Sequence, residues 1–130
     1  MENKIFTILV AEDEEASRFL YFEELSEEGY RVLQAGNGLQ VLGTLEDEKV
    51  DLLMTDIKMP DMHAEEMIPR VREDFPDLPI IVVSAFKGME QAFAQKGFGL
   101  SGFFSKPVDM EKLKKKIRGV LEASMVSKKH

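Results

Sequence analysis

The sequence predicts an α/β protein with a (βα)5 architecture, in which a doubly wound, five-stranded parallel sheet carries helices on both faces. Strand-like apolar runs and segments with helical spacing alternate five times along the 130-residue chain. Several of the strand-like runs are apolar throughout, which is typical of strands buried on both faces. No hairpin signal lies between consecutive strands, so each strand is expected to reach the next through a helix.

Short apolar or β-prone runs bounded by turn residues predict the five strands. The clearest is 79–84, with the sequence PIIVVS, and the first, IFTILVA at 5–11, is a continuous apolar run. In chain order, the predicted strands are 5–11, 31–35, 51–55, 79–84 and 102–105.

Apolar residues at three- and four-residue steps predict the helices, and capping residues mark several of their ends. Gly29 ends the first helix, Asn37 and Gln40 form a capping box for the second, and Asp109 caps the last. Pro69 lies inside the third and predicts a kink or a late start. The predicted helices cover 14–28, a segment after Asn37, 64–75, 89–96 and a segment from Asp109 to about Ser124.

The apolar positions of a helix predict the face that packs on the sheet. In the first helix these are Ala16, Phe19, Leu20 and Leu25. In the later helices they are Leu42, Leu45, Met67, Val71, Met110, Leu113, Ile117, Val120 and Leu121. Met89 and Phe93 of the short fourth helix either join the core or form a partner-binding patch, and core packing is favoured.

Length and composition predict one domain and exclude several kinds of site. We expect a single domain over 4–124, followed by a tail or linker remnant over 125–130. The chain has no cysteine, which excludes disulfides, thiolate nucleophiles and cysteine-ligated metals, and it has only two histidines, His63 and His130. No apolar run has the length of a membrane span and the N-terminus lacks the pattern of a signal peptide, so a soluble, cytoplasmic domain is expected.

The net charge of −7 is unevenly distributed. From Ser105 onward there are eight basic and three acidic residues, a net of +5, which leaves −12 for residues 1–104. The surface as a whole should therefore repel nucleic acid. The basic last helix is either a nucleic-acid contact or a solvated face, and we favour the solvated face.

Polar and charged residues gather where the predicted strands end. Glu12 and Asp13 follow the first strand, Asp56 the third, Ser84 the fourth and Lys106 the fifth. Taken singly, such a carboxylate more often caps the next helix, and such a serine or lysine is more often a turn or surface residue. A parallel sheet, however, brings the carboxyl ends of its strands to one edge, where ligands bind. The combination therefore indicates a functional site.

The residue types in this cluster suit phosphoryl transfer. Clustered carboxylates repel one another by roughly 4 kcal/mol per pair at about 4 Å and an effective dielectric constant of about 20, so their pKa values rise or they require cations. Lys106 supplies one positive charge, and Mg²⁺ is the divalent ion that suits a few carboxylates and several waters. A carboxylate can act as the nucleophile, while a metal, an ammonium and a hydroxyl stabilise the transferring group.

Four motifs in order resemble the receiver domain of two-component response regulators. They are ILVAEDEE at 8–15, MTDIKMPDM at 54–62, IVVSAF at 81–86 and GFFSKPVD at 102–109, and the resemblance covers about 4–123. It implies a strand order of 2-1-3-4-5 and a signalling phosphoacceptor that catalyses only its own phosphorylation and dephosphorylation. The phosphoryl donor would be a sensor histidine kinase or a histidine phosphotransfer protein.

The resemblance also implies roles for individual residues. Asp56 is the expected phosphoacceptor, and Glu12, Asp13, Asp56 and the backbone carbonyl of Lys58 are the expected Mg²⁺ ligands. Ser84 and Lys106 are expected to bind the phosphoryl oxygens, and the peptide bond between Lys106 and Pro107 is expected to be cis.

Other implied roles concern switching and lifetime. Phe103 occupies the position of the switch aromatic, although core packing explains it equally well, and it would report phosphorylation to the face formed by the fourth helix, fifth strand and fifth helix. Lys58 and Phe86 occupy positions that tune the lifetime of the phosphorylated form, and we hypothesise that Phe86 shields the acyl phosphate from water.

Two departures from the family pattern stand out. Glu12 replaces the commoner aspartate, so its longer side chain is expected to reach the metal through water. His63 and Ala64 replace the usual acidic or small residue and glycine, and we interpret them as a tolerated loop variant.

Three alternatives remain at this stage. The first is a degenerate receiver that binds partners without phosphorylation, and intact Asp13, Asp56, Ser84 and Lys106 argue against it. The second is a Mg²⁺-dependent phosphohydrolase, although the haloacid-dehalogenase type requires an aspartate where this chain has Lys58. The third is a receiver cut from a longer regulator or hybrid kinase.

The sequence does not identify the downstream effector or output domain. A homodimer that forms on phosphorylation is one expected assembly. We expect no contact with a membrane and no direct binding of nucleic acid by this domain.

Overall fold

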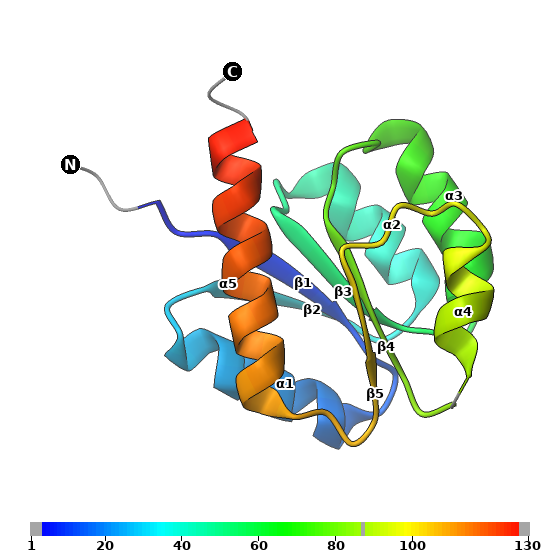
Figure 1. The fold of residues 1–130 in the computed structure, drawn as a ribbon, viewed down its shortest axis with the longest axis horizontal. Helices are drawn as coiled ribbons and strands as arrows, with labels where there is room; N and C mark the ends of the chain where they lie inside the picture. The colour runs from blue at the N-terminus through cyan, green and yellow to red at the C-terminus, as the bar shows by residue number, and fades with distance from the viewer. Residues whose placement is uncertain (1–3, 87, 128–130) are drawn as a thin grey trace.

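The structure, a computed structural model, describes residues 4–86 and 88–127, in which five strands and five helices alternate along the chain (Figure 1). The strands are β1 (Thr7–Ala11), β2 (Arg31–Ala35), β3 (Leu52–Asp56), β4 (Ile80–Ser84) and β5 (Gly102–Ser105). The helices are α1 (Glu15–Glu27), α2 (Gly38–Asp47), α3 (Ala64–Asp74), α4 (Met89–Ala94) and α5 (Met110–Ser127). All neighbouring strands pair in parallel, in the order β2-β1-β3-β4-β5. The predicted fold class and strand order are confirmed.

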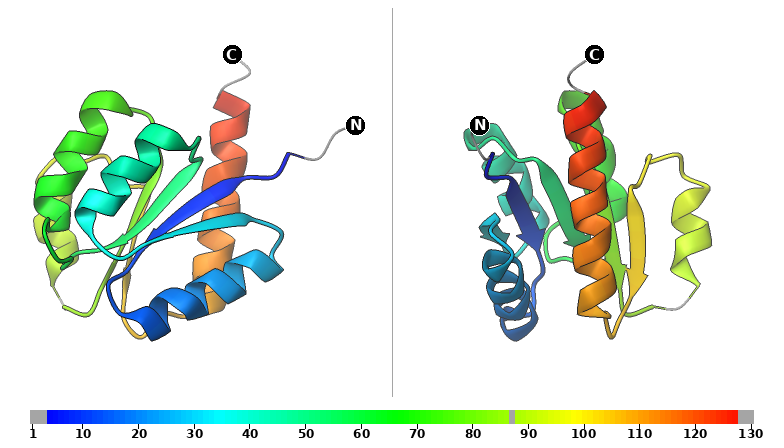
Figure 2. Two further views of the ribbon diagram at one scale, coloured as in Figure 1. Left: turned by 180° about the vertical axis from the view of Figure 1, so that it is seen from behind. Right: turned by 60° about the vertical axis from the view of Figure 1, so that its left-hand side comes forward.

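Helices cover both faces of the sheet (Figures 1 and 2). One apolar cluster joins the sheet to α2, α3 and α4, and a second joins its other face to α1 and α5. β1, β3 and β4, the three central strands, are buried at every position. This burial on both faces explains the nearly continuous apolar runs in their sequences.

The element boundaries differ from the predicted ones by a few residues. β1 begins two residues later than predicted, because Ile5 is 67% exposed and lies outside the sheet. β3 is displaced by one residue, so that Asp56 belongs to the strand itself. α4 ends two residues earlier, at Ala94. α5 continues to Ser127 and thus takes in the first residues of the predicted tail, while 128–130 lie outside the described residues.

The predicted helix caps are present. The side chain of Asn37 accepts a hydrogen bond from the Gln40 N–H at 2.8 Å, and Gln40 Oε1 accepts one from the N–H of Gly36 at 2.6 Å. Asp109 Oδ1 accepts from Glu111 N at 3.0 Å and from Lys112 N at 3.2 Å. The bonds from Gln40, Glu111 and Lys112 satisfy N–H groups that the first turn of a helix leaves without partners, while the bond from Gly36 involves the residue before the N-cap. Pro69 does not delay α3, which begins at Ala64.

The predicted inner face of α1 is wrong, apart from Leu25. Ala16 is exposed, and Phe19 and Leu20 are 53% and 48% exposed, whereas the buried residues are Tyr21 and Leu25. Arg18 lies about one helical turn before the buried Tyr21, and its Nη1 donates to the backbone carbonyl of Glu12 at 2.8 Å. A polar bond therefore helps to orient this helix, and an apolar count alone selects the wrong side.

The core prediction for α4 is confirmed at Phe93, which is fully buried, while Met89 is partly buried against the same cluster. In α2, Leu45 is buried as predicted, Leu42 is only partly buried, and Val41 is a buried residue that the prediction omits. Leu113, Ile117 and Leu121 of α5 are buried as predicted.

Part of the basic charge of α5 is neutralised within the fold. Lys114 is buried, and its ammonium lies 2.7 Å from a carboxylate oxygen of Glu24 on α1 and 3.6 Å from one of Glu111. This lysine joins two helices and is not part of a solvated face. Within residues 4–86 and 88–127, none of the helices has the length and hydropathy needed to cross a membrane.

Candidate functional site

The parallel sheet brings the predicted site residues to one edge, because all its strands end there. Glu12 and Asp13 follow β1, and Asp56 is the last residue of β3. Ser84 is the last residue of β4, and Lys106 follows β5. In the strand register, Ser84 lies opposite Ser105, the residue before Lys106.

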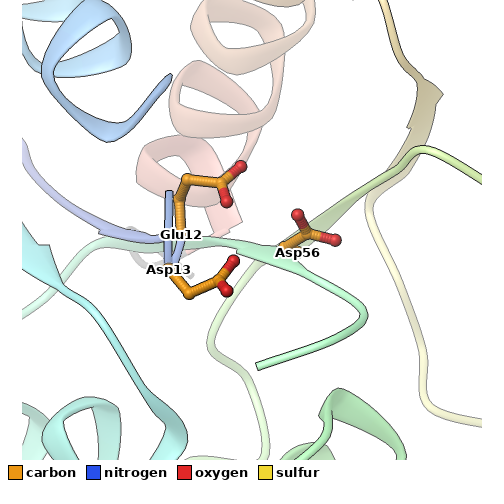
Figure 3. Close-up of side chains that lie close together, drawn as sticks. All are labelled: Glu12, Asp13 and Asp56. Carbon is orange, nitrogen blue, oxygen red and sulfur yellow. The ribbon is translucent and has the colours of Figure 1, made fainter. Parts of the chain in front are cut away.

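Three carboxylates form an acidic cluster at this edge. Figure 3 shows the side chains of Glu12 and Asp13, from the end of β1, beside that of Asp56. One oxygen from each of the three lies within 4.8 Å of the others. Glu12 is 2% exposed and Asp56 9%, whereas Asp13 is open to solvent. The cluster is thus closed on one side and accessible on the other.

Lys106 bridges two of the three carboxylates. Its Nζ donates to Glu12 Oε1 at 2.6 Å and to Asp56 Oδ2 at 2.8 Å. The longer glutamate side chain at position 12 thus reaches the lysine directly. When ionised, the three carboxylates and Lys106 sum to a charge of −2, which one divalent cation balances.

Burial and ion pairing perturb the titration of this site in opposite ways. Burial, more than any other factor, raises the pKa of Glu12, although its bonds to Lys106 and to the Glu14 N–H partly oppose the rise. Burial alone would lower the pKa of Lys106, but its hydrogen bonds to Asp56 and Glu12 outweigh this and raise the pKa well above its usual range. Lys106 is therefore a permanent cation at physiological pH.

Backbone contacts orient both buried carboxylates. The N–H of Ile57 donates to Asp56 Oδ1 at 2.6 Å, and the N–H of Glu14 donates to Glu12 Oε2 at 3.1 Å. The contact of Arg18 with the Glu12 carbonyl holds the turn that carries the acidic pair. No sequence pattern predicts this role of Arg18, because its partner is a backbone atom that any residue could supply.

The loop after Asp56 packs tightly against the start of α2. A Cβ at Gly38 would lie 2.7 Å from both the Cβ and the carbonyl oxygen of Met62, closer than any side chain tolerates. Ala64 is buried, and its N–H donates to the carbonyl of Ile57 at 2.9 Å. A glycine at position 38 is therefore needed for this loop to reach its position, and no pattern in the sequence predicts this requirement.

The hydroxyl of Ser84 hydrogen-bonds to the backbone of the β4–α4 loop. Its hydroxyl is buried, accepts from the N–H of Phe86 at 2.9 Å and donates to the carbonyl of Phe86 at 3.3 Å. The ring of Phe86 is 43% exposed, and the ammonium of Lys58 lies 4.6 Å from the ring centroid. The loops that follow Asp56 and Ser84 are thus joined by a cation–π contact.

Phe103 is half-buried on the α4 side of β5. Its ring centroid lies 6.1 Å from that of Phe93, and it pairs with Val82 in the strand register. The Lys106–Pro107 peptide bond is cis.

Comparison with known proteins shows the family of the chain. The model of the response regulator receiver domain matches residues 8–118. This chain belongs to the response regulator receiver family. Receiver domains are signalling domains. The chain is 30% identical over 114 residues to sporulation initiation phosphotransferase F of Bacillus subtilis, a match that covers 88% of the chain and 92% of that protein.

Other relatives are longer proteins or solved structures. The chain is 32% identical over 124 residues to the transcriptional regulatory protein GlrR of Escherichia coli, and this match covers 95% of the chain but 28% of GlrR. The response regulator TrrA of Thermotoga maritima, solved in complex with Mg²⁺ and BeF, has a TM-score of 0.81 and 29% identity, and the match covers 89% of the chain and 99% of TrrA. The chain thus spans most of sporulation initiation phosphotransferase F but only 28% of GlrR.

Proposed function

We propose that this receiver accepts a phosphoryl group on Asp56 from a phosphohistidine donor and that the modification changes which partner it binds. The observation that carries the proposal is the bridge from Lys106 to Glu12 and Asp56, at 2.6 and 2.8 Å, beside the exposed carboxylate of Asp13. This arrangement places a nucleophilic carboxylate, a cation and further metal ligands within one small site.

Mg²⁺ suits the donor set, because three carboxylate oxygens within 4.8 Å of one another are hard ligands with a net charge that a divalent ion neutralises. Glu12, Asp13, Asp56 and the backbone carbonyl of Lys58 would hold it, with Asp13 the more direct ligand and Glu12 acting through water. When bound, Mg²⁺ would supply the charge that stabilises the phosphoryl oxygens.

The transfer of the phosphoryl group depends on the chain's own residues. A carboxylate oxygen of Asp56 forms a bond to phosphorus while the bond between phosphorus and the donor imidazole breaks, and the released imidazole takes a proton from solvent. Lys106 already lies against Asp56 and is positioned to pair with the incoming phosphoryl oxygens. Ser84 would turn from the backbone of Phe86 to donate its hydroxyl to the same group.

Membership of the receiver family indicates which kinds of protein would donate the phosphoryl group and bind the modified domain. The donor would be a sensor histidine kinase or a histidine phosphotransfer protein, and the relatives include the sensor kinase CckA of Brucella abortus, at 32% identity over 120 residues. Phe103 would report the modification to the surface of α4, β5 and α5, where a downstream effector, an output domain or a second phosphorylated copy would bind.

Lys58 and Phe86 are proposed to set the lifetime of the aspartyl phosphate. Their contact at 4.6 Å spans the two loops beside Asp56, and the ring of Phe86 would limit the approach of water to the acyl phosphate.

Intact mass spectrometry tests the proposal. The chain is incubated with acetyl phosphate, with and without Mg²⁺, beside an Asp56→Asn variant. A gain of one phosphoryl group that requires Mg²⁺ and Asp56 is the expected result. No gain under any condition would contradict the proposal and favour a receiver that binds partners without phosphorylation.

A further inference from the structure

The side chain of Arg72, on the last turn of α3, holds two loops together through four backbone carbonyls. Its Nη1 donates to the carbonyls of Phe75 at 3.2 Å and Leu78 at 2.6 Å, in the loop between α3 and β4. Its Nε donates to Phe98 O at 2.9 Å and its Nη2 to Gly99 O at 3.0 Å, in the loop between α4 and β5. All three guanidinium nitrogens are used, and we call this group of contacts the Arg72 clamp.

The Arg72 clamp lies at the end of the sheet opposite Asp56. Both loops lead from a helix into the start of a strand, whereas the acidic cluster lies where strands end (Figure 1). The clamp therefore fixes the C-terminal side of the α4 segment to α3 and contacts nothing at the acidic cluster itself. A lysine has one nitrogen and could not reproduce this geometry.

The remainder of the α4 segment is weakly held by comparison. Of the six residues of α4, all described, only Phe93 is buried. Gly88 and Gly97 flank the helix with φ values of +84° and +71°, a conformation that glycine adopts without strain. Phe93 packs edge-on against Phe98 at a centroid distance of 5.7 Å, so the buried residue of α4 contacts the clamped loop.

We propose that the Arg72 clamp is a fixed pivot: rearrangement of the α4 face on phosphorylation is confined to Gly88–Gly97 and stops at Phe98–Gly99. The proposal rests on the proposed function, because it concerns the response to phosphorylation at Asp56. It assigns Arg72 a positioning role that is separate from the acidic cluster. Phe98 and Gly99 keep their positions relative to α3, while the end of α4 nearest Ser84 moves.

Hydrogen–deuterium exchange of the full chain, before and after treatment with acetyl phosphate and Mg²⁺, tests this pivot. Arg72→Met removes the N–H donors and keeps most of the aliphatic side chain. Arg72→Lys keeps the positive charge and is the second variant, to be used if Arg72→Met does not fold. Arg70→Met is the matched control, because Arg70 lies on the same helix and bonds only to Glu66, at 3.6 Å, among the described residues.

In the unmodified protein we expect Arg72→Met to accelerate exchange at Phe98–Ser101, measured at the Ser101 N–H that donates to Ile80 O at 2.8 Å, by about ten- to a hundred-fold, as loss of charge-assisted hydrogen bonds implies. Arg72→Lys should give a smaller acceleration, and Arg70→Met none. In the wild type, phosphorylation should change exchange in α4 and leave Phe98–Ser101 unchanged. In Arg72→Met the change should spread into Phe98–Ser101, which loss of stability alone does not predict.

Two results would overturn the pivot: unchanged exchange at Phe98–Ser101 in both Arg72 variants, or equal phosphorylation-linked changes in α4 and Phe98–Ser101 of the wild type. Absence of any phosphoryl mass gain would instead overturn the proposed function, and with it the phosphorylation-linked movement. The exchange of the unmodified variants would then still decide whether the clamp holds the loop.

Discussion

Replacing Lys106 by methionine should destabilise the domain by about 2–4 kcal/mol at pH 7 and by much less at pH 5. Methionine keeps most of the apolar stem but removes the ammonium that bonds to Glu12 at 2.6 Å and to Asp56 at 2.8 Å. Both carboxylate side chains are nearly buried, at 3% and 11% exposed, so the substitution leaves negative charge without its partner in a site with little water.

The size of the effect has an upper limit set by protonation. Removing one partner of a buried ion pair costs about 3–5 kcal/mol. A carboxylate left without its partner can instead take a proton. Protonation costs about 1.4 kcal/mol for each pH unit above the reference pKa of ~4.3, which amounts to about 3.7 kcal/mol at pH 7. The side chain of Lys106 is itself 24% exposed, so water offsets part of the loss and the lower end of the range, about 2 kcal/mol, is the minimum expected.

The pH dependence has a definite sign. Burial already raises the pKa of Glu12 in the folded wild type, and loss of Lys106 removes an interaction that lowers it. A carboxylate whose folded pKa exceeds its unfolded pKa stabilises the fold below the unfolded pKa and loses that contribution as the pH rises through the folded pKa. The penalty in Lys106→Met should therefore be small near pH 4–5 and grow towards neutral pH.

Urea unfolding followed by far-UV circular dichroism at pH 5, 6 and 7 measures this penalty. Lys115→Met, which alters an exposed lysine of α5, is the control and should stay within about 0.5 kcal/mol of the wild type. Adding Glu12→Gln to Lys106→Met should recover part of the lost stability at pH 7. A penalty clearly below about 2 kcal/mol at pH 7, or one independent of pH, would refute the electrostatic reasoning.

Two further predictions concern the loops beside Asp56. Phe86→Ala should shorten the lifetime of the phosphorylated form about two- to five-fold, which is the change in rate that corresponds to loss of the cation–π contact with Lys58. The dephosphorylation rate is followed by intact mass, and an unchanged rate would disprove the shielding hypothesis. Gly38→Ala should destabilise the fold by about 1–3 kcal/mol through its clash with Met62. Gly43→Ala is the control and should not be destabilised, because nothing lies within 4 Å of the added Cβ. Equal midpoints of urea unfolding for Gly38→Ala and Gly43→Ala would contradict the prediction that the clash with Met62 lowers the free energy of unfolding.

The sequence predicts the sheet well because burial on both faces leaves a strong signal. β1, β3 and β4 are apolar at nearly every position and buried at all of them, and caps such as Asn37 mark where helices begin. The face of α1 was predicted wrongly because Phe19 and Leu20 are exposed while Arg18 bonds inward to a backbone carbonyl. An apolar pattern carries no information about such a bond.

The residues of the candidate site could be predicted as a group because parallel strands bring their ends together. Their contacts could not, because they depend on side-chain geometry. The sequence does not predict that Lys106 donates to the side chain of Glu12, or that the Phe86 N–H donates to Ser84. The Arg72 clamp has backbone acceptors only and therefore leaves no pattern in the sequence.

The central claim, that Asp56 carries the phosphoryl group, is tested most directly by locating the modification. The chain is treated with acetyl phosphate and Mg²⁺ and then with borohydride, which reduces an aspartyl phosphate to homoserine, and its peptides are sequenced by mass spectrometry. Homoserine at position 56 alone, and only when Mg²⁺ was present, is the predicted result. Homoserine at position 13, or unmodified aspartate at both positions after a phosphoryl mass gain, would contradict the claim.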